Sequence, residues 1–266
     1  MVRLFDRLDT LRPQIKQAAR LLIFLDFDGT LAPIVDFPED AEMPEPTRAV
    51  LAKMTQAPEF VVSLISGRSI RDLSRRAAVS PVILAGNHGL EIHGPGIEFI
   101  DLEAVALGPM TSTLRRALQA RLLPIEGVEV EDKNLSLSIH FRRSPGSREA
   151  ILVALSELVD RQLFRVREGE MVAEVLPRVD TNKGTAMRYI RAAREEPGDL
   201  IVCAGDDSTD EDLFAAANGG ITIRVGDAAE TAADYFVEST DQLRTFLFWL
   251  TEVKAPVAYR DGRHGQ

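Results

Sequence analysis

Two carboxylates follow an unbroken apolar run near the start of this chain. The run LLIFL, residues 21–25, leads directly into Asp26 and Asp28. A short continuous apolar run predicts a buried strand of a parallel sheet, and charges at its end are costly unless something neutralises them. Residues two apart in an extended chain point the same way, so both carboxylates can face one site. A hard divalent cation such as Mg²⁺ would suit that site, because it binds carboxylate oxygens and substrate phosphates.

A second apolar run ends in a hydroxyl and a cation. FVVSLI, residues 60–65, predicts another buried strand, and Ser66, Gly67 and Arg68 follow it. In open α/β sheets ligands bind at the carboxyl ends of the strands, so these residues are expected near the two carboxylates. Ser66 suits either a plain turn or a phosphate contact. Arg68 either binds the substrate or pairs with an acid.

A third apolar run, residues 200–205, is followed by an acid cluster that contains Asp206, Asp207 and Asp210. Acids in this place suit either metal binding or the start of a helix, where side-chain oxygens cap free N–H groups. Before this run, TNKGTAMRYI at residues 181–190 predicts a helix start that carries Lys183. Taken alone, Lys183 would be a solvated surface lysine.

In this order the four segments resemble the motifs of the haloacid-dehalogenase-like (HAD) phosphotransferases. The resemblance implies that Asp26 is a nucleophile that forms an aspartyl-phosphate, and that Asp28 is the general acid and base. It also implies a Mg²⁺ ion between the Asp26 carboxylate, the backbone carbonyl of Asp28 and Asp206. Asp207 and Asp210 are then candidates for the outer coordination shell.

The same resemblance gives roles to the polar residues of the other two motifs. Ser66 and the amide of Gly67 would hold phosphate oxygens, and Lys183 would neutralise the charge of the phosphoryl group in transfer. Arg68 is a candidate substrate contact. These roles follow from the resemblance, whereas the spacing of the residues indicates only that the groups can meet.

Strands and helices alternate in the first part of the chain and again after residue 181. Such alternation predicts an α/β fold with a doubly wound parallel sheet. The expected strands are residues 21–26, 60–65 and 82–85, with helices at 46–56 and 69–77. Residues 86–101 predict two short paired strands, and residues 1–22 an amphipathic leading helix.

The pattern changes between residues 110 and 180. This segment predicts an open antiparallel sheet with two helices, inserted as a cap domain between the second and third motifs. We therefore expect a core domain made of residues 1–109 and 181–266, and a cap domain of residues 110–180. The expected cap elements are helices at 110–121 and 147–161, a strand pair at 128–143, and a hairpin at 164–177 that turns at Glu168 and Gly169.

Several cap segments are similar to those of trehalose-6-phosphate phosphatases. They are EDKNLSLSIHFRR, GEMVAEVLPRVDTNKGTA and, just before the cap, LAGNHGLEIH. The resemblance implies a sugar-phosphate substrate, trehalose 6-phosphate, whose hydroxyls would contact Lys133, His140, Arg142 and Glu174. It also makes Asn87 and His88 candidate substrate-binding residues, although His88 either contacts the substrate or only packs.

Composition excludes some classes of partner. The chain has 266 residues and a net charge of −10, which argues against nucleic-acid or membrane-surface binding because both favour a basic face. Its one cysteine, Cys203, permits no internal disulfide, and no signal peptide or spanning run is present, so we expect a cytoplasmic location. We also expect a monomer, with a trehalose-phosphate synthase as a candidate partner.

Three other functions remain open at this point. One is a HAD phosphatase for another sugar phosphate, such as sucrose-phosphate, a glycosyl-glycerate phosphate or a hexose phosphate. Another is a non-catalytic HAD-like module that regulates a partner enzyme. The third is a phosphomutase, which would have to protect the phosphate on Asp26 from water.

Overall fold

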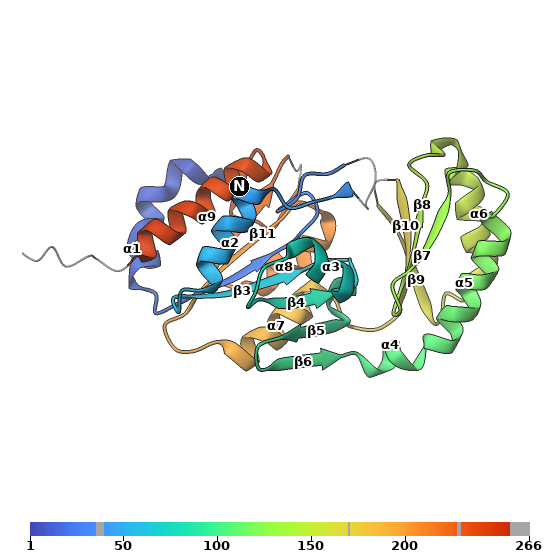
Figure 1. Ribbon diagram of the computed structural model, residues 1–266, viewed down its shortest axis with the longest axis horizontal. Coiled ribbons are helices and arrows are strands. Elements are labelled where there is room, and N and C mark those ends of the chain that lie inside the picture. Colours follow the sequence, from blue (N-terminus) through green and yellow to red (C-terminus); the bar gives the residue numbers. More distant parts are fainter. Residues whose placement is uncertain (36–39, 170, 228–229, 256–266) are drawn as a thin grey trace, which may run out of the picture.

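A three-layer core and a separate two-layer unit make up the molecule (Figure 1). The computed structural model describes residues 1–35, 40–169, 171–227 and 230–255. Within these residues, nine strands form the core sheet in the order β1-β13-β12-β11-β2-β3-β4-β5-β6, and four form a second sheet in the order β7-β8-β10-β9. No helix in these ranges is long and apolar enough to span a bilayer.

The core sheet is parallel except at one edge. Neighbouring strands run parallel from β1 to β4, whereas β5 and β6 pair antiparallel. The strands are β1 (Val2–Arg3), β2 (Leu21–Leu25), β3 (Phe60–Ile65), β4 (Ile83–Gly86), β5 (Glu91–Gly94), β6 (Ile97–Ile100), β11 (Leu200–Gly205), β12 (Ile221–Val225) and β13 (Tyr235–Val237).

Helices cover both faces of this sheet. On one face lie α1 (Leu8–Gln17), α2 (Glu45–Thr55), α3 (Ile70–Ala77) and α9 (Thr240–Lys254), and on the other lie α7 (Lys183–Arg194) and α8 (Glu211–Ala216). Alternate residues of β2 point to opposite faces of the sheet. Leu21, Ile23 and Leu25 pack against the helices of the first face, and Leu22 and Phe24 pack against those of the second. Burial on both faces explains the continuous apolar runs of the sequence.

The order of the strands fixes where a ligand can bind. From β2 the chain moves to β3 and β4 on one side, and after the inserted unit it returns to β11 on the other side. Strand β2 therefore lies at the point where the winding direction reverses. A crevice forms at such a point, outside the carboxyl ends of the strands.

The inserted unit stacks two helices on one face of an antiparallel sheet. Its strands are β7 (Glu129–Asp132), β8 (Leu137–His140), β9 (Phe164–Gly169) and β10 (Val172–Pro177), and its helices are α5 (Gly108–Leu122) and α6 (Arg148–Leu158), with the short α4 (Leu102–Ala106) leading in from the core. Leu137, Ile139 and Phe141 pack under the helices. The other face of the sheet is turned toward the core (Figure 1).

The predicted fold class is confirmed, with two differences in detail. The hairpin of β9 and β10 turns after Gly169, because Glu168 and Gly169 still pair with Ala173 and Val172. The sequence-based turn at Glu168 and Gly169 was therefore placed too early. The leading segment contributes a strand as well as a helix: Val2 and Arg3 pair with β13, and α1 packs on α9.

Candidate active site

The ends of β2, β3 and β11 open into one cavity of about 430 Å³ between the core and the inserted unit. Almost every residue that the sequence marked as a site candidate lines it. These are Asp26, Asp28, Ser66, Gly67, Arg68, His88, Lys133, His140, Arg142, Glu174, Lys183, Asp206 and Asp207. Asn87 and Asp210, the other two candidates, lie fully buried behind its wall.

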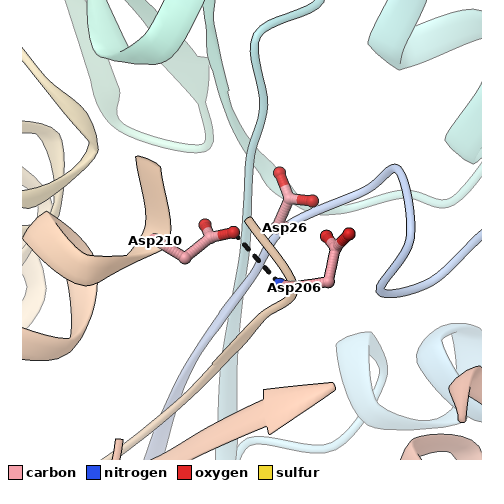
Figure 2. A group of neighbouring side chains, drawn as sticks. All are labelled: Asp26, Asp206 and Asp210. Carbon is pink, nitrogen blue, oxygen red and sulfur yellow. Dashed lines mark hydrogen bonds between the residues drawn. The ribbon is translucent and has the colours of Figure 1, made fainter. Parts of the chain in front are cut away.

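Three carboxylates lie close together at this cavity, of which Asp26 and Asp206 line it and Asp210 is fully buried. Asp26, Asp206 and Asp210 each place an oxygen atom within 4.8 Å of the other two (Figure 2). Burial raises the pKa of Asp26 well above its usual value, and burial and the neighbouring Asp210 raise the pKa of Asp206 to about 6. A set of oxygen ligands with crowded negative charge fits a hard divalent cation such as Mg²⁺.

Lys183 balances part of this charge. Its Nζ lies 2.6 Å from Asp26 Oδ1 and 2.7 Å from Asp210 Oδ1, and its side chain is buried. Burial alone would lower the pKa of Lys183, but the two carboxylates raise it well above the ordinary value. The helix start predicted for this lysine is confirmed, because Asn182 caps α7 and accepts a hydrogen bond from the amide of Thr185.

Asp210 also holds the backbone of the acid loop. Its Oδ2 accepts hydrogen bonds from the amides of Asp206 at 3.1 Å and Asp207 at 3.0 Å. The carboxylate of Asp207 points elsewhere, to Arg167 at 2.8 Å, and does not belong to the group of three. Of the two candidates for the outer shell, Asp210 is thus a member of the group of three, and Asp207 is turned away from it.

Gly29 lets Asp206 approach the β2 loop. It has φ of +74°, and a Cβ atom here would lie 2.0 Å from Asp206 Oδ2. The hydroxyl of Thr30 donates to Asp206 Oδ1 at 3.2 Å. Both residues of the Gly-Thr pair that follows Asp28 therefore help to place Asp206.

Arg68 makes ion pairs while it lines the cavity. Its guanidinium donates to both carboxylate oxygens of Asp28, at 2.7 and 2.6 Å, and to Asp72 at 2.6 Å. Burial opposes ionisation of Asp72, but Arg76 and Arg68 outweigh it and lower its pKa to about 2. The acid-pairing role is thus present in this structure, and the position of Arg68 leaves a substrate role open.

Glu174 is the centre of the contacts between the inserted unit and the core. Its carboxylate lies 3.1 Å from His88 Nε2 and 3.2 Å from Lys133 Nζ. Burial would raise its pKa, but His88 and Lys133 hold the pKa well below the usual range. Burial also lowers the pKa of His88, and the buried Nδ1 of its ring has no hydrogen-bond partner among the described residues.

The strand register gathers polar side chains in one row. Ser138 of β8 pairs with Glu131 and Glu174, and Glu174 pairs with Arg167, so the four residues share the face that lines the cavity. His140 shares this face with Ser138, and its Nε2 lies 2.9 Å from Glu131 Oε2. The apolar residues of β8 occupy the opposite face.

Glu131 and Arg167 were not found by sequence reasoning. Arg167 lies 2.8 Å from Asp207 and 2.9 Å from Ser208 Oγ, and thus joins β9 to the acid loop. The alternation of β7 and β9 could have placed both residues on the polar face. Their partners, however, come from other strands and from the core, which no local pattern indicates.

Asn87 does not reach the cavity. Its side-chain amide is fully buried and bonds to Glu91, to the carbonyl of Lys133 and to Ser136. The adjacent His88 does reach the cavity, and its ring lies so close to Gly67 that a Cβ atom there would approach it to 2.7 Å. Of the two neighbouring candidates, only His88 is therefore placed to contact a ligand.

Comparison with known proteins identifies relatives of this chain. A family described as trehalose-phosphatase matches residues 24–241. The trehalose-phosphate phosphatase of Mycobacterium ulcerans (strain Agy99) is 35% identical over 263 residues, which cover 92% of this chain and 65% of that protein. The chain thus spans slightly less than two thirds of that relative's length.

Solved structures show the same fold. The C-terminal domain of the trehalose-6-phosphate phosphatase of C. albicans superposes with a TM-score of 0.81 at 24% identity, over 95% of this chain and 98% of that one. A haloacid dehalogenase-like hydrolase from Bacteroides thetaiotaomicron superposes with a TM-score of 0.62 at 17% identity, over 86% and 98%. At these identities the likeness concerns the fold alone, and it confirms the expected fold class, a parallel-sheet core with an inserted α/β unit.

Proposed function

The chain belongs to the trehalose-phosphatase family, and from that premise we propose that it hydrolyses trehalose 6-phosphate to trehalose and inorganic phosphate. One observation carries the proposal. Lys133 and Glu174 of the inserted unit and His88 of the core meet in the same cavity as Asp26 and Lys183. The same cavity therefore contains groups suited to phosphoryl transfer and groups that can form hydrogen bonds with sugar hydroxyls.

In the proposed mechanism Asp26 attacks phosphorus and forms an aspartyl-phosphate, which water then hydrolyses. Phosphoryl transfer depends mainly on positioning and on neutralising charge. Lys183 supports both, because its ammonium lies 2.6 Å from the attacking carboxylate. Ser66, which is buried at the end of β3 and lines the cavity with Gly67, would hold a phosphate oxygen together with the amide of Gly67.

Asp28 is the proposed general acid and base. It would protonate the leaving sugar oxygen and later take a proton from the attacking water. In this structure both of its carboxylate oxygens accept hydrogen bonds from Arg68, and both are engaged as long as this pair holds. We infer that Arg68 turns from Asp28 to the substrate phosphate before the leaving group is protonated.

The proposed cofactor is Mg²⁺. Asp26, Asp206 and the backbone carbonyl of Asp28 would hold it, with Asp210 beside them. When bound, the ion would neutralise phosphate charge and align the phosphoryl group with Asp26. The residues of this chain supply an all-oxygen ligand set, which fits that metal.

The inserted unit, residues 110–180 in our proposal, would bind the sugar part of the substrate. His140, Arg142, Lys133 and Glu174 supply donors and acceptors on one wall of the cavity. A sugar that fails to pair with such buried polar groups loses rate by orders of magnitude. Other sugar phosphates remain the nearest alternative substrates. The cytoplasmic location, the monomeric state and a synthase partner stay predictions.

Glu174→Gln should lower kcat/KM more for the disaccharide phosphate than for a small phosphate ester. A charged acceptor of sugar hydroxyls contributes about 1.5–3 kcal/mol, so kcat/KM for trehalose 6-phosphate should fall roughly tenfold or more. The measurement is the ratio of that loss to the loss with p-nitrophenyl phosphate, which does not fill the cap. Equal losses would point to a folding defect, and no loss with either substrate would make Glu174 a plain structural residue.

A further inference from the structure

The buried amide of Asn87 joins the core to the inserted unit. Its Nδ2 donates to Glu91 Oε1 at 2.8 Å and to the carbonyl of Lys133 at 3.1 Å, while its Oδ1 accepts from Ser136 Oγ at 2.6 Å. The side chain is completely buried and does not line the cavity. Both hydrogens of the amide and its oxygen are therefore used in linking protein segments.

On the core side Asn87 is tied to the loop that would hold the phosphate. Its backbone amide donates to the carbonyl of Arg68 at 2.7 Å, and the next amide, of His88, donates to the carbonyl of Ser66 at 2.9 Å. Glu91, which accepts from the Asn87 side chain, also accepts from the amide of Ile70 at the start of α3. The φ of Asn87 is +50°, a left-handed conformation that Asn adopts more readily than most residues.

On the other side Asn87 holds a tight turn between β7 and β8. Within this turn the amide of Lys133 donates to the carbonyl of Ser136 at 3.0 Å, and the amide of Leu135 donates to the carbonyl of Lys133 at 2.9 Å. Leu135 also packs against Leu90 of the core. The turn is therefore fixed to the core through its backbone, its serine hydroxyl and its leucine.

Lys133 extends from this turn into the cavity. Its Nζ lies 3.1 Å from the carbonyl of Gly67 and 3.2 Å from Glu174 Oε1. The backbone of Lys133 is thus held by Asn87, and its ammonium is held by the carbonyl of Gly67 and by Glu174. An error of about 1 Å in such a contact can cost on the order of a hundredfold in rate.

We propose that Asn87 is a positioning residue, which fixes the 133–136 turn and through it the ammonium of Lys133 over the substrate cavity. The inference rests on the proposed function for its kinetic readout. It reassigns Asn87 from a substrate contact, as the family resemblance implied, to a residue that acts through Lys133. The hydroxyl of Ser136 is the partner on the cap side, and it too lies outside the cavity lining.

A double-mutant cycle tests this proposal. Ser136→Ala removes one bond to Asn87 without touching the cavity, and we expect kcat/KM for trehalose 6-phosphate to fall roughly tenfold, mainly through KM. In a Lys133→Met background the same substitution should change kcat/KM less than about twofold, because the group being positioned is gone. The matched control is Ser147→Ala, a buried cap serine bonded to Ser144, which should leave kcat/KM unchanged.

The two substitutions would act independently if Ser136 merely stabilised the fold. An equal loss with and without the Lys133 ammonium, or no loss from Ser136→Ala, would therefore overturn the proposal. Amide hydrogen exchange across residues 133–136 needs no substrate and should quicken in Ser136→Ala and Asn87→Gly but not in Ser147→Ala. If the wild-type protein did not hydrolyse trehalose 6-phosphate, the proposed function would fail, and unchanged exchange in these variants would separately refute the anchoring role.

Discussion

Asp26→Asn should abolish phosphate release while the fold survives. Asp26 is the buried acid at the end of β2 whose carboxylate contacts Lys183, so its removal takes away the proposed nucleophile. Losing such a group costs roughly 10⁴-fold or more in rate. The measurement is phosphate release by purified variant and wild type at equal concentration, with both trehalose 6-phosphate and p-nitrophenyl phosphate.

Stability must be followed in the same experiment. The amide keeps the shape of the carboxylate, and Lys183 retains Asp210 at 2.7 Å, so the variant should unfold at nearly the wild-type temperature. Asp241→Asn, an exposed change on α9, is a matched control that should keep full activity. Appreciable turnover by a clean Asp26→Asn preparation would contradict covalent catalysis by this residue.

Removal of divalent metal should stop the reaction, and added Mg²⁺ should restore it. Asp26, Asp206 and Asp210 crowd three carboxylates against one buried lysine, which leaves net negative charge for a cation to balance. We expect activity to disappear in excess chelator and to return on titration with Mg²⁺. In Asp206→Asn the Mg²⁺ concentration needed for half-maximal activity should rise roughly tenfold or more, because one charged ligand is lost.

A readout without substrate separates metal binding from catalysis. A ligand that binds only the folded state raises the unfolding temperature as its concentration increases. Mg²⁺ should therefore stabilise the wild-type protein more than Asp206→Asn. Full activity in excess chelator would rule out the metal role given to Asp206.

The sequence was informative where local pattern and chemistry coincide. Three of the four core motifs follow strands that are almost entirely buried, so the apolar runs located Asp26, Ser66 and Asp206 directly after their strand ends. Strand order in a doubly wound sheet then brings these ends together. The alternation of apolar and polar residues in Leu137, Ser138, Ile139 and His140 likewise matches the two faces of β8.

Interactions between distant segments could not be read in this way. Arg167 meets Asp207 across the cavity, and Asn87 meets Ser136 across the junction of the two units. The sequence around Asn87 does not indicate that its side-chain amide forms hydrogen bonds with a turn far along the chain. The β9–β10 turn was misplaced for a related reason: Gly169 suggested a bend, but pairing with Val172 keeps it in the strand.

A panel of sugar phosphates would show which substrate the protein hydrolyses most efficiently. Initial rates of phosphate release would be measured with Mg²⁺ for trehalose 6-phosphate, sucrose-phosphate, a glycosyl-glycerate phosphate, glucose 6-phosphate and p-nitrophenyl phosphate. Because Lys133, His140, Arg142 and Glu174 can pair with the hydroxyls of a disaccharide, we expect the highest kcat/KM for trehalose 6-phosphate, roughly a hundredfold above that for the monosaccharide phosphate. An equal or higher kcat/KM for any other member of the panel would contradict the assignment.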